Sequence, residues 1–416
     1  MSNFRTSLKL GIFLGVRQLK RANRSTTGLI IFIMTLTFLN LVVVSGILIG
    51  LIVGGNIANR SQYTGDVILT TPYGKNDITN SQDIIATLQS NSHVTGYSER
   101  FIQGGTIEAN YKTRTNFNDL PNQTSTQITG IDVGHEQDFS NISKYVTEGS
   151  FLDPTQSGYI VIGANLLERY STFDTGTLLK GVYPGDTVKV TINGATQEFI
   201  VKGILKSKVG EVSLRAFITE NDFLRVAGRA SLDANEISIK HDTVVSDDQL
   251  KQTLVASGFS DDAKIQTATE AIPDFLNQIK LAFGVLGNMI GAIGIVVASI
   301  TIFIVIFINA VTRKKYIGIL KGIGVSPLAI QISYLLQSLF YAASGSILGT
   351  AILYGLLVPF FNAHPVNFPF SDGILVADPL GTLVRVIILL IVTLIAGYIP
   401  ARMIIKKNTL DSILGR

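Results

Sequence analysis

The stretch LIIFIMTLTFLNLVVVSGILIGLIV, residues 29–53, decides the fold of this chain. It lies within a run of 35 residues without a charged side chain, between Arg24 and Arg60. As a helix rising 1.5 Å per residue it spans about 37 Å, enough to cross a hydrocarbon core of roughly 30 Å. The run is longer than the apolar core of a signal peptide, usually about 7–15 residues. We therefore expect an uncleaved first transmembrane helix.

Three further apolar runs follow, at residues 281–311, 328–361 and 380–400. The last contains one charge, Arg385, which we expect to reach toward the membrane surface rather than contact a substrate. A buried helix of a soluble protein is the alternative reading of any single run. Four such runs predict four transmembrane helices.

The composition agrees with this prediction. Charged residues make up 15% of the 416 residues, against about 25% in a typical soluble domain, and the mean hydropathy is +0.38. The chain has no Cys, which excludes disulfides, thiolate metal sites and a cysteine nucleophile.

The distribution of charge predicts the orientation. Residues 1–28, 312–327 and 401–416 together carry 14 basic residues and one acidic residue, whereas residues 54–280 carry 19 basic and 27 acidic residues. The segment 362–379 has no Lys or Arg. Because basic loops stay on the cytoplasmic side, we expect a multi-pass protein of the cell membrane with both termini and the 312–327 loop in the cytoplasm. Residues 54–280 and 362–379 then lie outside, and residues 401–416 form a cytoplasmic tail.

Residues 1–28 are predicted to form an amphipathic helix in the inner headgroup layer, with membrane lipid as its partner. The alternative is an ordinary helix packed on protein. The apolar residues of this pattern are Phe4, Leu8, Ile12, Val16 and Leu19, and the basic residues between them are Arg5, Lys9, Arg17, Lys20, Arg21 and Arg24.

Residues 54–280 are predicted to form an α+β extracytoplasmic domain, of one or two lobes, inserted between the first two spans. Asn193-Gly194 predicts a type I′ turn joining strands 186–192 and 196–205 into a hairpin. Further strands are expected at 159–162, 214–219 and 236–240, and helices at 164–170 and 246–257. In the last helix Ser246 is the predicted cap and Leu250, Leu254 and Val255 the buried face. The polar stretch 110–127 is expected to be a loop or a lobe junction.

Small residues recur in the apolar runs and predict faces where helix backbones approach closely. Packing within one chain and a seam between two copies both remain open. The residues are Gly46, Gly50, Gly284, Gly287, Gly291, Gly294, Ala298, Gly345 and Gly349.

Few catalytic patterns are present. There is no GxxxxGK[ST] phosphate loop, and His135-Glu136 lacks the second histidine of a zinc-protease motif, because position 139 is Phe. His93, His135, His241 and His364 are expected at the surface. We therefore expect no catalytic residue, no metal site and no cofactor on this chain, and no binding of nucleic acid. Such a membrane protein needs a partner to do work.

The segment RKKYIGILKGIGVS, residues 313–326, resembles the R-x-x-E-I-G-I-L-R-A-L-G-A-S signature of FtsX-like, MacB-type (type VII superfamily) ABC transporter permeases. Tyr316 stands where that family often has Glu, and Gly322 where it often has Ala. The segment GYIPAR, residues 397–402, with residues 410–414, resembles the family's C-terminal motif, although its usual Pro and second basic position are not kept. Residues 160–163, 185–186 and 199–205 resemble elements of its outer domain.

The resemblance implies a permease subunit, with no ATPase activity of its own, that transmits ATP-driven motion of a separate cytoplasmic ABC ATPase dimer to its outer domain for export or extrusion. ATP and Mg would bind to that ATPase. A second permease copy or a homologue would complete the transporter, and an extracytoplasmic adaptor is an open question. The implied ATPase-coupling residues are Arg313, Lys314, Lys315, Ile317, Gly318, Leu320, Lys321, Gly322 and Gly324, and the C-terminal motif residues are Tyr398, Pro400, Ala401 and Arg402.

Two alternatives stay open at this point. A lipoprotein-releasing permease of the same superfamily has a similar order of segments. A membrane-anchored sensor or binding protein without transport is the alternative from a different class, and dependence on an ATPase would discriminate it.

Overall fold

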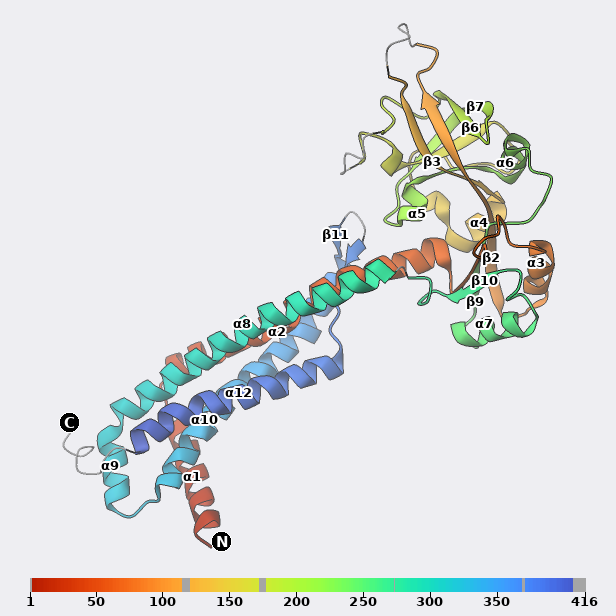
Figure 1. The fold of residues 1–416 in the computed structure, drawn as a ribbon. Helices are drawn as coiled ribbons and strands as arrows, with labels where there is room; N and C mark the ends of the chain where they lie inside the picture. The colour runs from red at the N-terminus through yellow and green to blue at the C-terminus, as the bar shows by residue number, and fades with distance from the viewer. Residues whose placement is uncertain (1, 114–119, 172–176, 273, 369–370, 407–416) are drawn as a thin grey trace. The chain divides into compact units, whose positions relative to one another are not determined.

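A computed structural model describes residues 2–113, 120–171, 177–272, 274–368 and 371–406 (Figure 1). The chain divides into two compact units. The helical unit contains residues 1–53, 278–367 and 373–416, and the outer unit contains residues 54–277 and 368–372. Each unit is described by itself.

The helical unit is built from long apolar helices. Within the described residues, four helical stretches are long and apolar enough to cross a membrane: Arg24–Thr64, Leu276–Thr312, Pro327–Ala363 and Pro379–Met403. The helices are α1 (Ser2–Lys20), α2 (Arg24–Asn59), α8 (Asp274–Thr312), α9 (Lys314–Gly322), α10 (Pro327–Ile352), α11 (Val358–Ala363) and α12 (Pro379–Ile405), with π-helical turns η1 (Arg60–Thr64) and η4 (Leu353–Leu357). The stretches in α8 and α12 lie over the runs expected at 281–311 and 380–400.

Several boundaries differ from the sequence expectation. Helix α9 lies within the connecting segment 312–327, and α12 continues to Ile405, into the expected tail. The outer segment 362–379 contains the short strands β11 (Val366–Phe368) and β12 (Ser371–Gly373), which pair with each other. Part of this segment belongs to the outer unit, where Asp372 forms an ion pair with Lys208.

Glycines bring the helices of this unit together within one chain. A Cβ atom on Gly287 or Gly291 of α8 would lie 3.0 Å from Cα of Ser45 or 2.7 Å from Cδ1 of Leu41 on α2. A Cβ atom on Gly345 of α10 would lie 2.5 Å from Cβ of Met34, also on α2. Small residues allow this approach because a larger side chain would separate the backbones.

Three other glycines make comparable contacts. Gly349 of α10 lies against the ring of Phe38 on α2. Gly46 and Gly50 of α2 lie against the backbone of Val376 and Ile374, in the extended segment that precedes α12. Around Gly284, by contrast, a Cβ atom would meet nothing within 4 Å.

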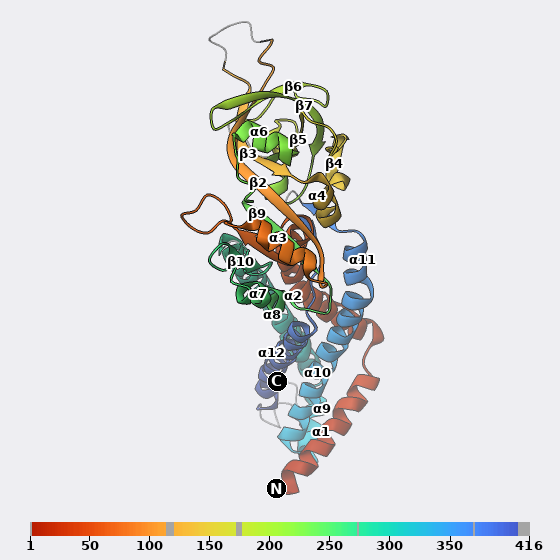
Figure 2. The same ribbon diagram turned by 90° about the vertical axis from the view of Figure 1, so that its right-hand side faces the viewer.

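Helix α1 packs on α10 (Figure 2), but through a different face from the apolar one. Gly11 lies against Ala329 and Ile332, and Ser7 hydrogen-bonds to Ser326 at 2.8 Å. The apolar residues Phe4, Leu8, Ile12, Phe13 and Val16 are exposed. The helix is thus packed on protein along its small residues and leaves its apolar stripe uncovered.

The outer unit is an α+β fold. Its strands are β1 (Val67–Thr70), β2 (Val94–Ala109), β3 (Gln123–Ile131), β4 (Val146–Gly149), β5 (Tyr159–Gly163), β6 (Thr187–Ile192), β7 (Ala195–Leu205), β8 (Arg215–Thr219), β9 (Glu236–His241) and β10 (Lys264–Thr267). Its helices are α3 (Ser81–Ser90), α4 (Val133–Ser140), α5 (Gly210–Ser213), α6 (Glu220–Ala227) and α7 (Asp247–Ala256), with 3₁₀ turns η2 (Ile142–Tyr145) and η3 (Ala164–Leu166).

The strand pairings close a ring (Figure 2). The ring runs β2-β3-β8-β5-β7-β6 and returns to β2, because β6 pairs with both β7 and β2. Beyond the ring, β2 also pairs with β9, which continues to β1 and β10. The strand β2 has 16 residues and is shared between the ring and this second group of strands.

The predicted hairpin is confirmed. Strands β6 and β7 pair in antiparallel register from Thr187–Ile200 to Ile192–Ala195. The turn residues Asn193 and Gly194 have φ values of 50° and 82°, as a type I′ turn requires.

Three predictions in this unit are wrong. The helix expected at 164–170 is only the 3₁₀ turn η3, since Leu166 and Leu167 are both buried and Leu167 bridges to Leu179 in extended form. Residues 123–127 of the expected loop belong to β3, whose alternating Thr and Gln suit a strand; residues 114–119 lie outside the described part. On α7, Ser246 forms the predicted cap, but Val255 is exposed.

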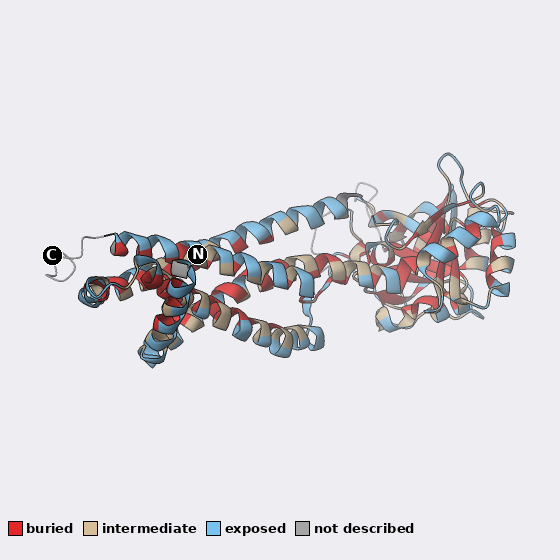
Figure 3. Ribbon diagram, turned by 90° about the horizontal axis from the view of Figure 1, so that it is seen from below, coloured by how far each residue is buried: buried red, intermediate tan, exposed pale blue. Residues whose placement is uncertain are grey.

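Buried apolar residues concentrate in the strands of the outer unit (Figure 3). Val188, Val190 and Ile192 of β6 are all fully buried, at every second position, as expected for a strand with one face on the core. In the helical unit the buried residues form stripes, and wide apolar faces stay exposed.

The contact of Gly345 with α2 leads to a first prediction. In Gly345→Ala the new Cβ lies 2.5 Å from Cβ of Met34 and 3.0 Å from its carbonyl carbon, so one helix must shift. We expect a loss of about 1–3 kcal/mol in stability, measured as a lower midpoint of thermal unfolding in detergent. Gly284→Ala is the matched control and should leave the midpoint unchanged or slightly higher, because Ala favours helix. Equal midpoints for the two variants would contradict this packing.

Candidate functional site

The segment between α8 and α10 forms a short helix with defined ends. Helix α8 ends at Thr312 and α9 begins after Arg313, whose backbone is not helical. Gly324 ends the segment with a φ of 89°, a conformation that favours glycine. Ser326 then caps α10 by accepting a hydrogen bond from the amide of Ala329, with Pro327 in the first turn.

Helix α9 has a buried and an exposed face. Ile317 and Gly318 are buried, and so is Leu320. On the other side Tyr316, Ile319 and Ile323 are 50%, 53% and 72% exposed. The exposed residues share a face because they are three and four positions apart.

The residues expected to couple to an ATPase therefore divide into two groups. Ile317, Gly318 and Leu320 hold α9 on the helical unit. Arg313, Lys314 and Lys321 are half-buried, and Lys315, Gly322 and Gly324 are exposed. The exposed apolar residues Ile319 and Ile323 were not among the residues singled out from the sequence.

Two contacts tie α9 and its flanks to the neighbouring helices. The ammonium group of Lys321 donates to the carbonyl oxygen of Ile405 at 3.0 Å, at the C-terminal end of α12, where a cation is favourable. Ser326 bonds to Ser7 of α1. The segment thus lies where α1, α10 and α12 meet.

The C-terminal motif lies in α12. Pro400 and Ala401 are buried, and the guanidinium of Arg402 lies 5.8 Å from the ring centroid of Tyr398. Pro400 has no amide hydrogen, so one backbone hydrogen bond of the helix is missing there. Residues 410–414 lie outside the described part.

Arg385 does more than reach toward a membrane surface. It is half-buried, and its guanidinium donates to Oγ of Ser45 at 2.9 Å, which links α12 to α2.

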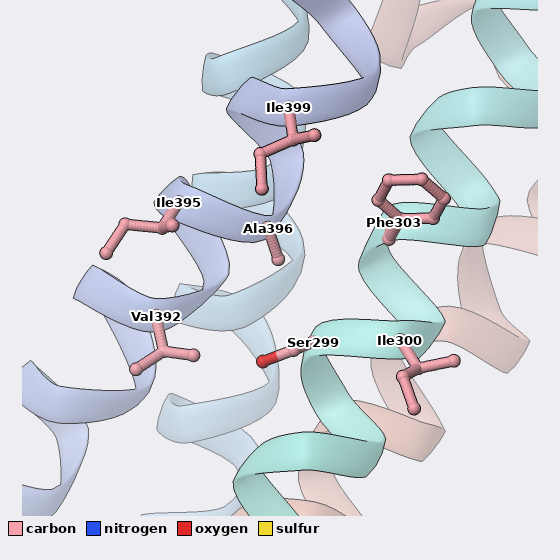
Figure 4. Close-up of a pocket in the computed structure, with 7 residues that line it drawn as sticks. All are labelled: Ser299, Ile300, Phe303, Val392, Ile395, Ala396 and Ile399. Atoms are coloured by element: carbon pink, nitrogen blue, oxygen red, sulfur yellow. The ribbon is translucent and has the colours of Figure 1, made fainter.

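An apolar groove of about 320 Å³ runs between α8 and α12 (Figure 4). Its lining residues are Ser299, Ile300, Phe303, Val392, Ile395, Ala396 and Ile399. The hydroxyl of Ser299 already donates to the carbonyl of Ile295, so the groove suits an apolar chain or helix and not a polar solute.

In the outer unit, the end of the first long helical stretch is held by a buried cluster of Tyr63, Arg100, Glu136, Arg215 and Glu236, here the Tyr63 cluster. Two guanidinium groups lie over the ring of Tyr63, in η1, with Arg100 at 4.8 Å and Arg215 at 5.1 Å from its centroid. Such cation–π contacts are strongest when they are shielded from water, and Tyr63 is only 7% exposed.

Each guanidinium of the cluster has a carboxylate partner. Nε of Arg100 lies 2.8 Å from Oε2 of Glu136, its Nη2 lies 3.0 Å from Oε1, and its Nη1 donates to the backbone oxygen of Tyr63 at 2.9 Å. Arg215 donates to both oxygens of Glu236. Ser98 and Ser140 donate to Glu136, which completes its hydrogen bonding.

The cluster joins η1 to β2, α4, β8 and β9. A second contact nearby, from Ser207 to the side-chain oxygen of Gln62 at 2.5 Å, adds to this attachment. Sequence reasoning missed the cluster because its members are far apart along the chain.

A second polar group lies beside η1. Asp66, His241 and Asp247 place ligand atoms within 4.8 Å of one another, a spacing that a metal ion would accept. Arg60, however, donates to Asp66 at 2.8 Å and to Asp247 at 2.9 Å, which already balances the charge. His241 bonds to Asp247 at 2.9 Å and is mostly buried, contrary to the surface position expected for it.

Comparison with known proteins finds a family match in the C-terminal part of the helical unit. Residues 288–409 match the family described as FtsX-like permease C-terminal. This part of the chain is similar to the C-terminal domain of FtsX-like permeases. The match contains α9, α10 and α12, and with them residues 313–326 and 397–402, which carried the resemblance in the sequence.

One relative is an ABC transporter permease. The ABC transporter permease YtrF of Bacillus subtilis (strain 168) is 27% identical over 174 residues, which cover 38% of each chain. The chain therefore spans well under half the length of that relative.

Two solved structures are similar at 15% identity. They are the periplasmic region of MacB from Actinobacillus actinomycetemcomitans, with a TM-score of 0.35, and the extracellular domain of YknZ, a noncanonic ABC-type transporter from Gram-positive bacteria, with a TM-score of 0.31. They cover 53% and 49% of this chain, and 94% and 99% of their own. Both scores are low, so the assignment rests on residues 288–409.

The Tyr63 cluster yields a second prediction. Glu136→Gln leaves Arg100 buried without its carboxylate, which should cost about 3–5 kcal/mol. Hydrogen exchange of the β2 amides in the full chain should accelerate accordingly. The control is Glu198→Gln, because the Lys112–Glu198 pair is 62% and 51% exposed and should change exchange little. Similar effects from both variants would argue against a central role for the buried pair.

Glu99 of β2 yields a third prediction. Burial, with the nearby Glu220 and Asp132 carboxylates, raises the pKa of Glu99 to about 7 from 4.5. The folded chain therefore holds this proton more tightly than the unfolded chain, so this group's contribution lowers stability by roughly 3 kcal/mol as the pH rises from 4.5 through 7. Glu99→Gln should remove that loss and unfold at higher temperature than the unaltered chain at pH 8, but not at pH 5. An equal gain at both pH values would contradict the assignment.

Proposed function

We propose that this chain is the permease subunit of an ABC transporter of the MacB/FtsX-like type. It lies in the cell membrane with both termini in the cytoplasm, and it transmits ATP-driven motion of a separate ATPase dimer to the outer unit for export or extrusion of a substrate. A second permease copy or homologue completes the assembly. The observation that carries the proposal is the match of residues 288–409 to FtsX-like permeases, at the part of the chain that contains α9.

The geometry of α9 supports docking of the ATPase. Ile317 and Leu320 fix the helix to the permease domain, so a force applied to α9 is passed to the other helices. Tyr316, Ile319 and Ile323 form an apolar face that no described residue of the chain covers. Such a face, surrounded by basic residues, suits a partner with an apolar pocket and an acidic rim.

The attachment of the first span supports transmission. Helix α2 continues through η1 without a loop, and η1 is held in the outer unit by the Tyr63 cluster. A displacement of this helix end must therefore move β2, β8 and β9, since the buried ion pairs resist separation. ATP and Mg belong to the partner ATPase in this proposal, and the chain itself is not an enzyme.

The docking face can be tested with single charges. We expect Ile319→Asp and Ile323→Asp to reduce recovery of the ATPase in pull-down of the tagged permease at least about tenfold, since each places a charge in an apolar interface. Val244→Asp in the outer unit is the control, because Val244 is 75% exposed, as Ile323 is at 72%. These variants test the exposed face more specifically than deletion of residues 313–326. The deletion would also remove Ile317 and Leu320 from the core.

Two results would oppose the proposal. Full recovery of the ATPase with both α9 variants would exclude docking through this face. If no ATPase is recovered even with the unaltered chain, and cells with an ATPase inactivated at its catalytic Glu keep the permease-dependent phenotype, a membrane-anchored sensor would replace the permease.

A further inference from the structure

A cavity of about 290 Å³ lies in the helical unit between α1 and the start of α9. Arg17, Gln18 and Arg21 line it from α1 and the turn that follows, and Arg313 and Tyr316 line it from the other side. Leu14 of α1 also lines it. Residues nearly 300 positions apart in the chain thus meet around one space.

The cavity gathers positive charge, and the described residues of the helical unit place no acidic side chain in its lining. In the described part of the helical unit, the only acidic residue is Asp378, which precedes α12. Helix α9 contacts the other end of α12, through Lys321 and Ile405. Asp378 and α9 therefore lie at opposite ends of α12. Three guanidinium groups that converge repel one another. A bias of basic residues toward the cytoplasm explains their side of the membrane but not their convergence on one cavity.

The polar groups that line the cavity are donors. The side-chain oxygen of Gln18 accepts a hydrogen bond from Gln337, so its amide nitrogen is the group left to donate. Tyr316 offers a phenolic hydroxyl, and each arginine offers a planar fork that fits two oxygens of a phosphate. A ligand that accepts hydrogen bonds and carries negative charge matches this set.

The surroundings favour a lipid as the source of the phosphate. The exposed stripe of α1 includes Ile12, Phe13 and Val16, which are 43%, 58% and 42% exposed and precede Arg17 directly. A phospholipid can place its headgroup in the cavity and its acyl chains along this stripe.

We propose that Arg17, Arg21 and Arg313 form a binding site for the phosphate of an anionic phospholipid of the inner leaflet. This inference rests on the membrane orientation of the proposed function and does not require ATPase docking. The bound phosphate offsets the repulsion between the three arginines and holds the end of α1 against the first turn of α9. The lipid would thereby influence the position of the helix proposed to receive the ATPase.

The test uses the purified full chain without ATPase. Native mass spectrometry in detergent measures binding of phosphatidylglycerol and of phosphatidylcholine. We expect preference for phosphatidylglycerol, and a loss of at least about tenfold in its affinity in Arg17→Gln/Arg21→Gln/Arg313→Gln. The control, Arg5→Gln/Lys9→Gln/Lys20→Gln, removes the same charge outside the cavity and should lose less than about threefold.

Four outcomes would overturn the proposal. An equal loss in both triple variants would show attraction by charge alone. Equal affinity for the two lipids would exclude recognition of an anionic headgroup. Displacement of phosphatidylglycerol by inorganic phosphate at the same concentration would assign the site to free phosphate. Unchanged lipid binding in the cavity variant, combined with loss of ATPase recovery by that variant alone in a separate pull-down of the tagged permease, would assign the arginines to an acidic surface of the partner protein.

A second measurement does not depend on the folding of a variant. Phenylglyoxal modifies accessible arginines, and peptide mapping follows Arg17, Arg21 and Arg313 in the unaltered chain. Nanodiscs with phosphatidylglycerol should slow modification of these three residues at least about threefold relative to phosphatidylcholine nanodiscs, with Arg402, outside the cavity, as the internal reference. Equal rates in the two nanodiscs would contradict the site. This readout also stands if ATPase docking fails, so the two proposals fail separately.

Discussion

The contact of Tyr63 with two paired arginines is the constraint on which the outer unit depends. Arg100 and Arg215 are charged groups removed from water, so each needs its carboxylate, and Glu136 and Glu236 provide them. Because these partners come from β2, α4, β8 and β9, the charges can be satisfied only when the sheet and α4 are assembled. The ring of Tyr63, in η1, then packs against both guanidinium groups. The end of the helix and the sheet thereby form one cooperative structure.

The helical unit depends on a different constraint, which is the close approach of its helix backbones. Gly287, Gly291 and Gly345 allow α8 and α10 to approach α2 where a methyl group would already collide. Polar contacts such as that of Arg385 with Ser45 also join helices of this unit. In an apolar environment, where burial of apolar surface contributes little between helices, this close fit supplies the association. Helix α9 benefits from it, since Ile317 and Leu320 need a fixed surface on which to pack.

The sequence predicted what local patterns encode. Long charge-free runs gave the four apolar helices, and Asn193-Gly194 gave the hairpin, because both signals lie in neighbouring residues. The motif at 313–326 indicated the family but not which side of α9 is exposed. Ile317 and Leu320 are buried and anchor α9, whereas Ile319 and Ile323 are exposed. On α1 the apolar residues do recur along one face, as the sequence predicted. The contacts with α10 and its cap, however, are made by Ser7 and Gly11. The Tyr63 cluster and the three-arginine cavity depend on tertiary neighbours, which no local pattern reports.

The strand β2 pairs with β3 and β6 in the ring and with β9 outside it. With 16 residues it is long enough to form part of both the ring and the second group of strands. Twist applied near Val94 has no loop in which to relax before it reaches Ala109. The ring and the second group of strands are therefore expected to twist together. Arg100, which is buried in β2, connects them to η1 at the end of the first long helical stretch.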